Sequence, residues 1–271
     1  MQQQNRRPRV GLALGGGGAR GAAHVGVLRV LEAAGISIDC IAGTSSGAMV
    51  GAAYAAGMPV DEIERIFSYV RLRDLFRPVW AADGLLDNSP LAQSVERVVG
   101  RLQVRDLRIP FAAMATDALT GEPVPIQDGP LSMALRASTA IPCLVRPVEY
   151  EGRRLIDGAV VHKVPVRLAR SLGAEIVIAV DLSHPAPWRG RRVRHPLAYL
   201  LRVIEMMDHH LVVGELAEAD VAIQPHVDCG SFQFHRSRAQ VRAGEDAAVN
   251  ALPLIRQRLA QPVTNEMAAA D

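Results

Sequence analysis

Apolar residues along the chain alternate between short continuous runs and longer stretches with helical spacing. Short runs that stop at glycine or at turn residues predict buried strands, and they cover Val10–Leu14, Ile38–Ala42, Ile109–Thr116, Glu122–Ile126, Val145–Ile156 (interrupted by a turn at Glu151-Gly152), Glu175–Leu182 and Val221–Pro225. Apolar residues three or four positions apart predict helices over Gly18–Ala34, Ser46–Ala56, Pro59–Val70, Val166–Ser171, His195–Val213 and Ala239–Leu259. This alternation predicts an α/β fold, in which helices cover both faces of a mainly parallel sheet.

The chain contains no internal repeat and no linker, so we expect a single domain over residues 9–260, with residues 1–8 and 261–271 as flexible tails. One internal segment, Arg71–Asn88, is predicted to be irregular and is called the cap segment below. It mixes arginines with Leu75, Phe76, Val79 and Trp80. Two interpretations are open: a mobile cap that meets a membrane, or a helix–loop unit packed over the edge of the core.

Composition narrows the range of functions. The formal charge of +2 over 271 residues predicts no nucleic-acid partner. The three cysteines are far apart and have no metal-ligand spacing, so we expect no metal site and a reducing compartment, the cytoplasm. No apolar stretch is long enough to span a bilayer, so any membrane contact would be peripheral. A basic loop at Trp188–His195 could either touch anionic head groups or be a solvated loop.

The first chemical candidate is Gly43-Thr44-Ser45-Ser46-Gly47, a G-x-S-x-G motif between a predicted buried strand and a helix. The glycines permit a tight strand-to-helix turn that exposes the central serine. The start of the helix then stabilises negative charge near Ser45. An ordinary glycine- and serine-containing loop is the alternative, but the strand–helix context favours a nucleophile.

A second candidate is the glycine run from Gly15 to Gly18, followed by Ala19, Arg20 and Gly21, which opens the first predicted helix. It contains G-x-G-x-x-G, the pattern of a dinucleotide-binding loop. That site needs an acidic residue at the end of the second strand, whereas Asp39 stands at its beginning. No Gly-Lys-[Ser/Thr] follows, which excludes a P-loop. Bare backbone N–H groups beside a nucleophilic serine would instead stabilise an oxyanion.

The third candidate is Asp157-Gly158-Ala159, at the end of an apolar strand. Taken alone, it is typical of a turn. Partial burial at a strand end should raise the pKa of the Asp157 carboxyl and make it a stronger base.

Together the three motifs resemble the patatin-like phospholipase family, in the short bacterial form related to the catalytic domain of neuropathy target esterase. That family combines a glycine-rich oxyanion loop, a G-x-S-x-G nucleophile and a D-G-[Gly/Ala] motif in this order. Further resemblances lie at Gly21–Leu28, Ala115–Glu122, Ala137–Pro142 and Glu218–Pro225. The resemblance implies a three-layer α/β/α sandwich that hydrolyses acyl esters of lipids or lysophospholipids, without a metal or an organic cofactor.

The resemblance also implies the roles of individual residues. Ser45 is expected to be the nucleophile and Asp157 the general base of a dyad. Gly16, Gly17 and Gly18 are expected to form the oxyanion hole, and Arg20 to brace their loop. The remaining motif positions that support the site are Gly21, Gly43, Gly47, Gly158 and Ala159.

Two other functions stay open at this point. An α/β-hydrolase with a Ser-Asp-His triad would take its histidine from positions 184, 195, 209, 210, 226 or 235. A patatin-fold protein without catalysis would act as a regulatory or lipid-binding partner. His24 lies on an apolar helix face and is expected to be a packing residue.

Overall fold

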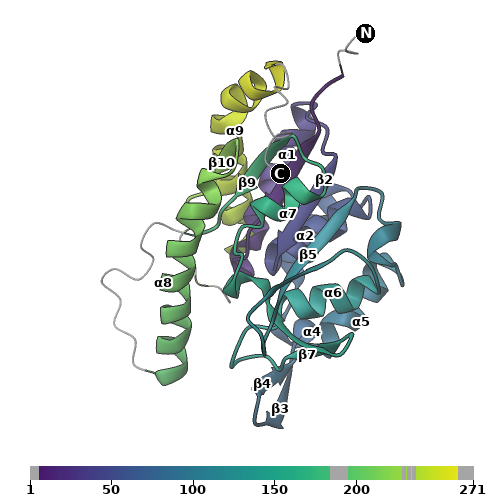
Figure 1. Ribbon diagram of the computed structural model, residues 1–271, viewed down its shortest axis with the longest axis vertical. Helices are drawn as coiled ribbons and strands as arrows, with labels where there is room; N and C mark the ends of the chain where they lie inside the picture. Colours follow the sequence, from purple (N-terminus) through teal and green to yellow (C-terminus); the bar gives the residue numbers. More distant parts are fainter. Residues whose placement is uncertain (1–5, 184–194, 228–229, 231–232, 234–235, 262–271) are drawn as a thin grey trace, which may run out of the picture.

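A mainly parallel sheet of eight strands lies at the centre of the protein, with helices on both faces (Figure 1). The structure is a computed structural model, and it describes residues 6–183, 195–227, 230, 233 and 236–261. Five strands run parallel in the order β10 (Val221–Ile223), β9 (Ile176–Val180), β1 (Val10–Leu14), β2 (Cys40–Thr44) and β5 (Phe111–Asp117). Three antiparallel strands complete the sheet on the β5 side: β6 (Pro123–Ile126), β8 (Arg153–Asp157) and β7 (Val148–Tyr150).

The two faces of the sheet belong to two separate apolar clusters. Along β1, Leu12 and Leu14 point into the larger cluster, while Ala13 points into the smaller one, because successive side chains of a strand face opposite sides. Helices of the larger layer are α1 (Ala22–Ala33), α2 (Ser46–Ala55), α3 (Val60–Tyr69), α6 (Leu131–Ser138) and α9 (Ser237–Ala260). The other layer contains α7 (Val166–Ser171) and part of α8 (Pro196–Ala217). The predicted α/β fold with a mainly parallel sheet is confirmed.

Strand register brings the predicted motifs to one region of the sheet. Leu14 pairs with Gly43, so β1 and β2 end together. Across the next strand, Thr44 pairs with Met114, and Ala115 pairs with Asp157. Asp157 and Ser45 therefore reach the same place from two strands that flank β5.

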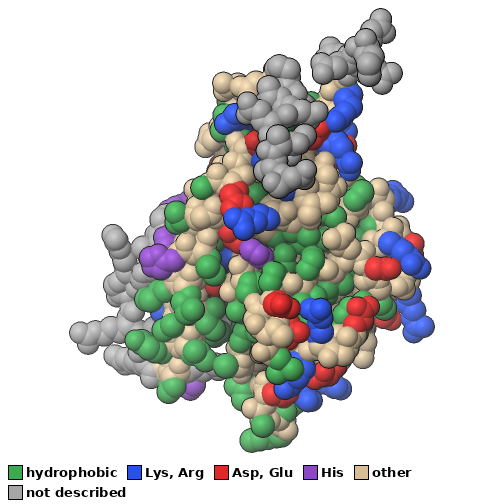
Figure 2. Space-filling model, viewed as in Figure 1, with side chains coloured by type: hydrophobic (Ala, Val, Ile, Leu, Met, Phe, Trp, Pro, Cys, Tyr) green, Lys and Arg blue, Asp and Glu red, His purple; other side chains and the backbone are tan. Residues whose placement is uncertain are grey.

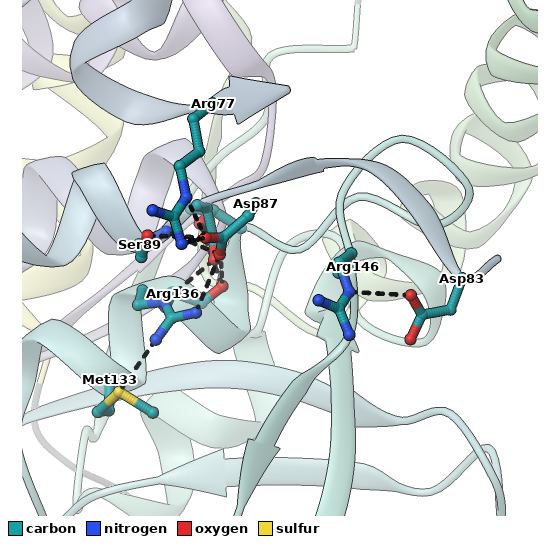
Figure 3. A network of polar contacts seen from close by, with 9 residues as sticks. Arg77, Asp83, Asp87, Ser89, Met133, Arg136 and Arg146 are labelled. Atoms are coloured by element: carbon teal, nitrogen blue, oxygen red, sulfur yellow. Dashed lines mark hydrogen bonds and ion pairs between the residues drawn. The ribbon is translucent and has the colours of Figure 1, made fainter. Parts of the chain in front are cut away.

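The cap segment is more regular than predicted. It contains the short helix α4 (Leu72–Leu75) and an antiparallel hairpin of β3 (Arg77–Ala81) and β4 (Gly84–Asp87). Charged side chains hold this hairpin (Figure 3): Asp87 pairs with Arg77 across the hairpin and with Arg136 of α6. The Arg146 guanidinium donates to Asp83 at 2.9 Å. These long-range ion pairs order a segment whose own sequence has no clear period.

Two further helices, outside the cap segment, were not predicted. They are α5 (Ser89–Val99) and α6, which pack against each other beside the cap segment. Leu91, Val95 and Val99 of α5 do have helical spacing, so this helix could have been found. Helix α6 has only eight residues, and its stability depends on burial in the larger cluster.

The predicted N-terminal tail is too long. Arg7 donates to both carboxylate oxygens of Asp39, at 2.6 and 2.7 Å, and Arg6 pairs with Glu175. Residues 6–8 are therefore attached to the body of the protein, because carboxylates at the start of β2 and before β9 bind their guanidinium groups. Residues 188–194 of the predicted basic loop lie outside the described residues, as do residues 1–5 and 262–271.

Helices α1 and α9 pack with their backbones almost in contact. A Cβ atom on Gly26 of α1 would lie 2.0 Å from the carbonyl oxygen of Val241, and one on Gly244 of α9 would lie 2.0 Å from that of Ala23. Both positions therefore require the absence of a side chain.

We predict that Gly26→Ala lowers the free energy of unfolding by about 1–3 kcal/mol, because the added methyl group forces the two helices apart. Urea denaturation followed by circular dichroism measures this change. Gly214→Ala in α8 is the matched control, since its Cβ atom would meet nothing within 4 Å and alanine favours a helix by about 0.5–1 kcal/mol. Equal stability of the wild type and Gly26→Ala would contradict the prediction.

Candidate active site

Ser45 stands at a sharp turn between β2 and α2. Its backbone has φ 54° and ψ −119°, a conformation that a serine adopts only at a cost in energy. The flanking glycines make the turn possible. A Cβ atom on Gly43 would lie 2.5 Å from the Cα atom of Ala48, and one on Gly47 would lie 2.1 Å from the carbonyl oxygen of Leu14. The G-x-S-x-G motif thus has the steric role expected for a nucleophile turn.

The glycine loop after β1 lies directly beside this turn. A Cβ atom on Gly16 would lie 3.3 Å from Ser45 Cβ and 3.6 Å from Ala159 Cβ, so the three predicted motifs meet here. At Gly21, a Cβ atom would lie 2.6 Å from Ser46 Cβ. Larger residues at either position would displace the serine turn.

Not all of the expected oxyanion donors are available. The N–H of Gly16 donates to the carbonyl oxygen of Lys163 at 3.0 Å, so Gly16 anchors the loop instead of facing an oxyanion. Within the described part of the chain, the N–H groups of Gly17 and Gly18 donate to no other group. These two glycines remain as candidate donors, together with the N-terminus of α2.

Arg20 braces the glycine loop, as expected from the sequence. Its side chain is buried, and its Nε donates to the carbonyl oxygen of Gly17 at 3.2 Å. One terminal nitrogen also pairs with Glu205 of α8 at 3.4 Å. The loop is therefore held from outside by a charge on another helix.

Asp157 ends β8 with its carboxyl group buried beside Ser45. Its Oδ1 accepts from the N–H of Ala159 at 2.9 Å. A Cβ atom on Gly158 would lie 2.4 Å from the carbonyl oxygen of Met114, so this glycine lets the turn pack on β5. Burial raises the pKa of Asp157 to about 7, against the opposing effects of the Ala159 N–H and of a hydrogen bond from the Ser45 side chain. The carboxyl group thus has the strength of a base that works near neutral pH.

His24 is a buried packing residue, as predicted. Its Nε2 donates to the carbonyl oxygen of Gly15 at 2.8 Å, and burial lowers its pKa to about 4, so the ring is neutral. Another histidine, His162, was missing from the sequence-based set of triad candidates. Its Nδ1 pairs with Glu215 of α8 at 3.1 Å.

Sequence reasoning also missed a buried ion pair close to Asp157. Lys163 is the only lysine of the chain, and its Nζ donates to Asp208 of α8 at 2.8 Å. Both side chains are almost inaccessible to solvent, and both charges act on the pKa of Asp157: Lys163 lowers it and Asp208 raises it. A single lysine among 29 arginines was a signal that could have been followed.

A narrow apolar pocket adjoins Ser45. Its lining includes Gly18, Ser45, Ser46, Met49, Ile66, Phe67, Val70, Leu75, Phe76, Leu91, Thr139 and Ile141. A second cavity between α2, α3 and α5 shares six of these residues, Met49, Ile66, Phe67, Val70, Leu75 and Leu91, and reaches Leu131 and Leu135 of α6. The described lining of the two cavities contains no histidine. The apolar lining suits the chemistry of an aliphatic chain.

A strained serine turn, a buried carboxyl group with a raised pKa and free backbone N–H groups beside an apolar pocket are the parts that hydrolysis of acyl esters requires. Comparison with known proteins agrees: the sequence profile described as "Patatin-like phospholipase" matches residues 12–170. This chain belongs to the patatin-like phospholipase family and is a carboxylic ester hydrolase.

Some similar proteins align with nearly the whole chain, and others align with about two thirds of it. An uncharacterized NTE family protein of Mycobacterium tuberculosis is 36% identical over 269 residues, which are 97% of this chain and 72% of that protein. Human patatin-like phospholipase domain-containing protein 6 is 33% identical over 181 residues, 64% of this chain but 13% of its own length.

Solved structures with much lower identity share the fold. VipD from Legionella pneumophila matches 92% of this chain and 67% of its own with a TM-score of 0.59 and 13% identity. ExoU from Pseudomonas aeruginosa matches 94% of this chain and 54% of its own with a TM-score of 0.55 and 15% identity. These likenesses support the three-layer architecture.

We predict that kcat/KM on a soluble ester rises with pH and is half-maximal near pH 7. A general base must be unprotonated, and burial holds the pKa of Asp157 at about 7. A pH–rate profile of the folded enzyme measures this midpoint. A midpoint near pH 4, the ordinary value for aspartate, would contradict the prediction.

For the Lys163–Asp208 pair we predict that removing either charge shifts the midpoint of the pH–rate profile, in opposite directions for the two residues. Lys163→Met removes a nearby cation and should move the midpoint to higher pH, whereas Asp208→Asn removes a nearby anion and should move it to lower pH. Both variants are compared by the same pH–rate profile. General structural damage would lower the maximal kcat/KM of both variants without moving the midpoint. Unchanged midpoints would therefore show that the pair has no electrostatic effect on Asp157.

Proposed function

We propose that Ser45 and Asp157 form a catalytic dyad that hydrolyses acyl esters of lipids. The observation that carries this proposal is that the strained Ser45 turn and the Asp157–Ala159 turn meet at Gly16, where burial raises the pKa of the Asp157 carboxyl to about 7. Such a carboxylate can accept the serine proton without an intervening imidazole. Ser45, at the strained turn, is the serine whose side chain acts on the pKa of Asp157, whereas Ser46 lies against Gly21.

The reaction proceeds in two half-reactions. Asp157 takes the proton of the Ser45 hydroxyl while the Ser45 Oγ attacks the ester carbonyl. The tetrahedral intermediate then collapses to an acyl-enzyme. The leaving alcohol receives the proton from Asp157. Asp157 then takes a proton from water, the hydroxide attacks the acyl carbonyl, and the fatty acid leaves as Ser45 regains its proton.

The N–H groups of Gly17 and Gly18 and the N-terminus of α2 would stabilise the oxyanion in both steps. Gly16 supports them through its bond to Lys163. Backbone donors fixed before the reaction stabilise developing charge without reorganisation, and the loss of one such donor typically costs about 3–4 kcal/mol.

The apolar pocket supports a lipid or lysophospholipid substrate. Its volume of about 60 Å³ holds only a few water molecules, so a long acyl chain has to widen it. Leu75 and Phe76 of the cap segment line the pocket, whereas Trp80 is fully exposed on the hairpin. Movement of the cap segment at a membrane surface would open the pocket. Its ion pairs with Arg136, Arg146 and Arg154 then have to break or move with it.

The dyad is favoured over a Ser-Asp-His triad because the buried Asp157 carboxyl is itself close enough to the Ser45 side chain for that side chain to lower its pKa. Two of the described histidines interact with other groups: the Nε2 of His24 donates to the carbonyl oxygen of Gly15, and the Nδ1 of His162 pairs with Glu215. A non-catalytic role is disfavoured because the nucleophile, the base and backbone donors are present together.

We predict that Ser45→Ala and Asp157→Asn remain folded and lose fatty acid release by about 100- to 10,000-fold. The measurement is release of free fatty acid from a panel of phosphatidylcholine, lysophosphatidylcholine and triacylglycerol. His24→Asn and His162→Asn should keep a substantial fraction of the rate. A folded histidine variant as inactive as Asp157→Asn would replace the dyad with a triad.

A further inference from the structure

Helix α8 is too long for the sheet that it covers. Its 22 residues extend about 33 Å, whereas the five residues of β9 extend about 17 Å. The chain enters β1 at the end where the N-terminus lies, so the carboxyl ends of the parallel strands, with Ser45, face the opposite end (Figure 1). The N-terminal half of α8 extends toward that same end. Residues 196–207 are called the overhang below.

The overhang has an apolar surface with no described partner in the fold. Among its described side chains none is buried; burial begins at Asp208. Tyr199 and Met207 are each 63% exposed. Figure 2 shows hydrophobic side chains gathered over this half of the helix. The solvent-facing side of the overhang is therefore more apolar than that of an ordinary surface helix in a globular protein.

Acidic residues of α8 point inward instead. Asp208 pairs with Lys163, Glu205 with Arg20, and Glu215 accepts from the N–H of Val164 at 2.8 Å. These contacts fix α8 to the two loops that carry the glycine donors and follow Asp157. They also leave the outward side of the overhang without an unpaired carboxylate.

A second apolar surface reaches the same end of the molecule. The β3–β4 hairpin projects there (Figure 1), with Trp80 fully exposed and Leu85 half exposed. Arg71 and Arg73 are exposed in the same cap segment. Aromatic and aliphatic side chains next to arginines are typical of elements that rest in a lipid interface.

We propose that the overhang of α8 docks on a phospholipid bilayer and, with the hairpin, places the catalytic edge of the sheet at the membrane. This inference rests on the proposed lipid substrate. A bilayer fits better than a second copy of the chain, because the apolar surfaces stand on two separate elements at the end where Ser45 lies. The absence of unpaired acidic groups on the overhang also removes repulsion from anionic lipids.

The test measures binding and catalysis separately. Tyr199 and Met207 are replaced together by Ser in an inactive Ser45→Ala background, and co-sedimentation with vesicles of phosphatidylcholine and phosphatidylglycerol is compared with Ser45→Ala alone. Because burial of two such side chains is lost, vesicle affinity should fall by about tenfold or more. Val249→Ser with Leu254→Ser is the matched control: both residues are exposed on α9, away from the catalytic end, and affinity should not change.

The same substitutions in the active enzyme should lower hydrolysis of vesicle phospholipid and leave hydrolysis of a short soluble ester unchanged. Unchanged vesicle binding would overturn the proposal. Equal loss on both substrates would also overturn it, since the overhang would then support the site itself. If sedimentation equilibrium shows a dimer that the double variant dissociates, the surface binds a second copy and not a bilayer. Vesicle binding by Ser45→Ala without turnover by the wild type would instead refute the proposed function alone.

Discussion

The whole site depends on how closely α2 approaches β1. A side chain on Gly47 would collide with the carbonyl oxygen of Leu14, and one on Gly43 with the start of α2. Without these side chains, the helix begins within one residue of the strand, and Ser45 takes a positive φ between them. The strained turn is stabilised by the buried strands on either side. The glycine loop after β1, and the Asp157 turn beside β5, are then packed against a nucleophile whose position is already set.

A buried carboxyl group is the second constraint. Burial alone would favour the protonated form of Asp157, and the N–H of Ala159 and the Ser45 hydroxyl offset part of that effect. The neighbouring Lys163–Asp208 pair adds two opposing charges. The result is a base whose pKa lies near neutrality, so its strength depends on α8 as well as on its own strand. The Lys163–Asp208 ion pair therefore affects the pKa of Asp157 as well as the packing of α8.

The same helix connects the site with the surface. Through Glu205, Asp208 and Glu215 its inner side contacts the loops around the dyad, while its outer side is apolar beyond the edge of the sheet. The strands determine how far the sheet extends, and beyond it the outer side of the extra turns of α8 is exposed at Tyr199 and Met207. One helix therefore contacts the loops next to Ser45 and Asp157 and also carries the exposed apolar surface.

The sequence by itself determined the α/β alternation, the turn at Ser45, the glycine loop and the Asp157 turn, because each depends on residues adjacent in the chain. A glycine at position 43 or 158 indicates that another part of the backbone packs closely there, even before that part of the chain is known. The tertiary structure decided the rest. Only strand register brings Asp157 to Ser45, and only folding shows that the Gly16 N–H is bonded to Lys163 and that ion pairs order the cap segment. These contacts join residues distant in sequence, and no local pattern specifies such partners.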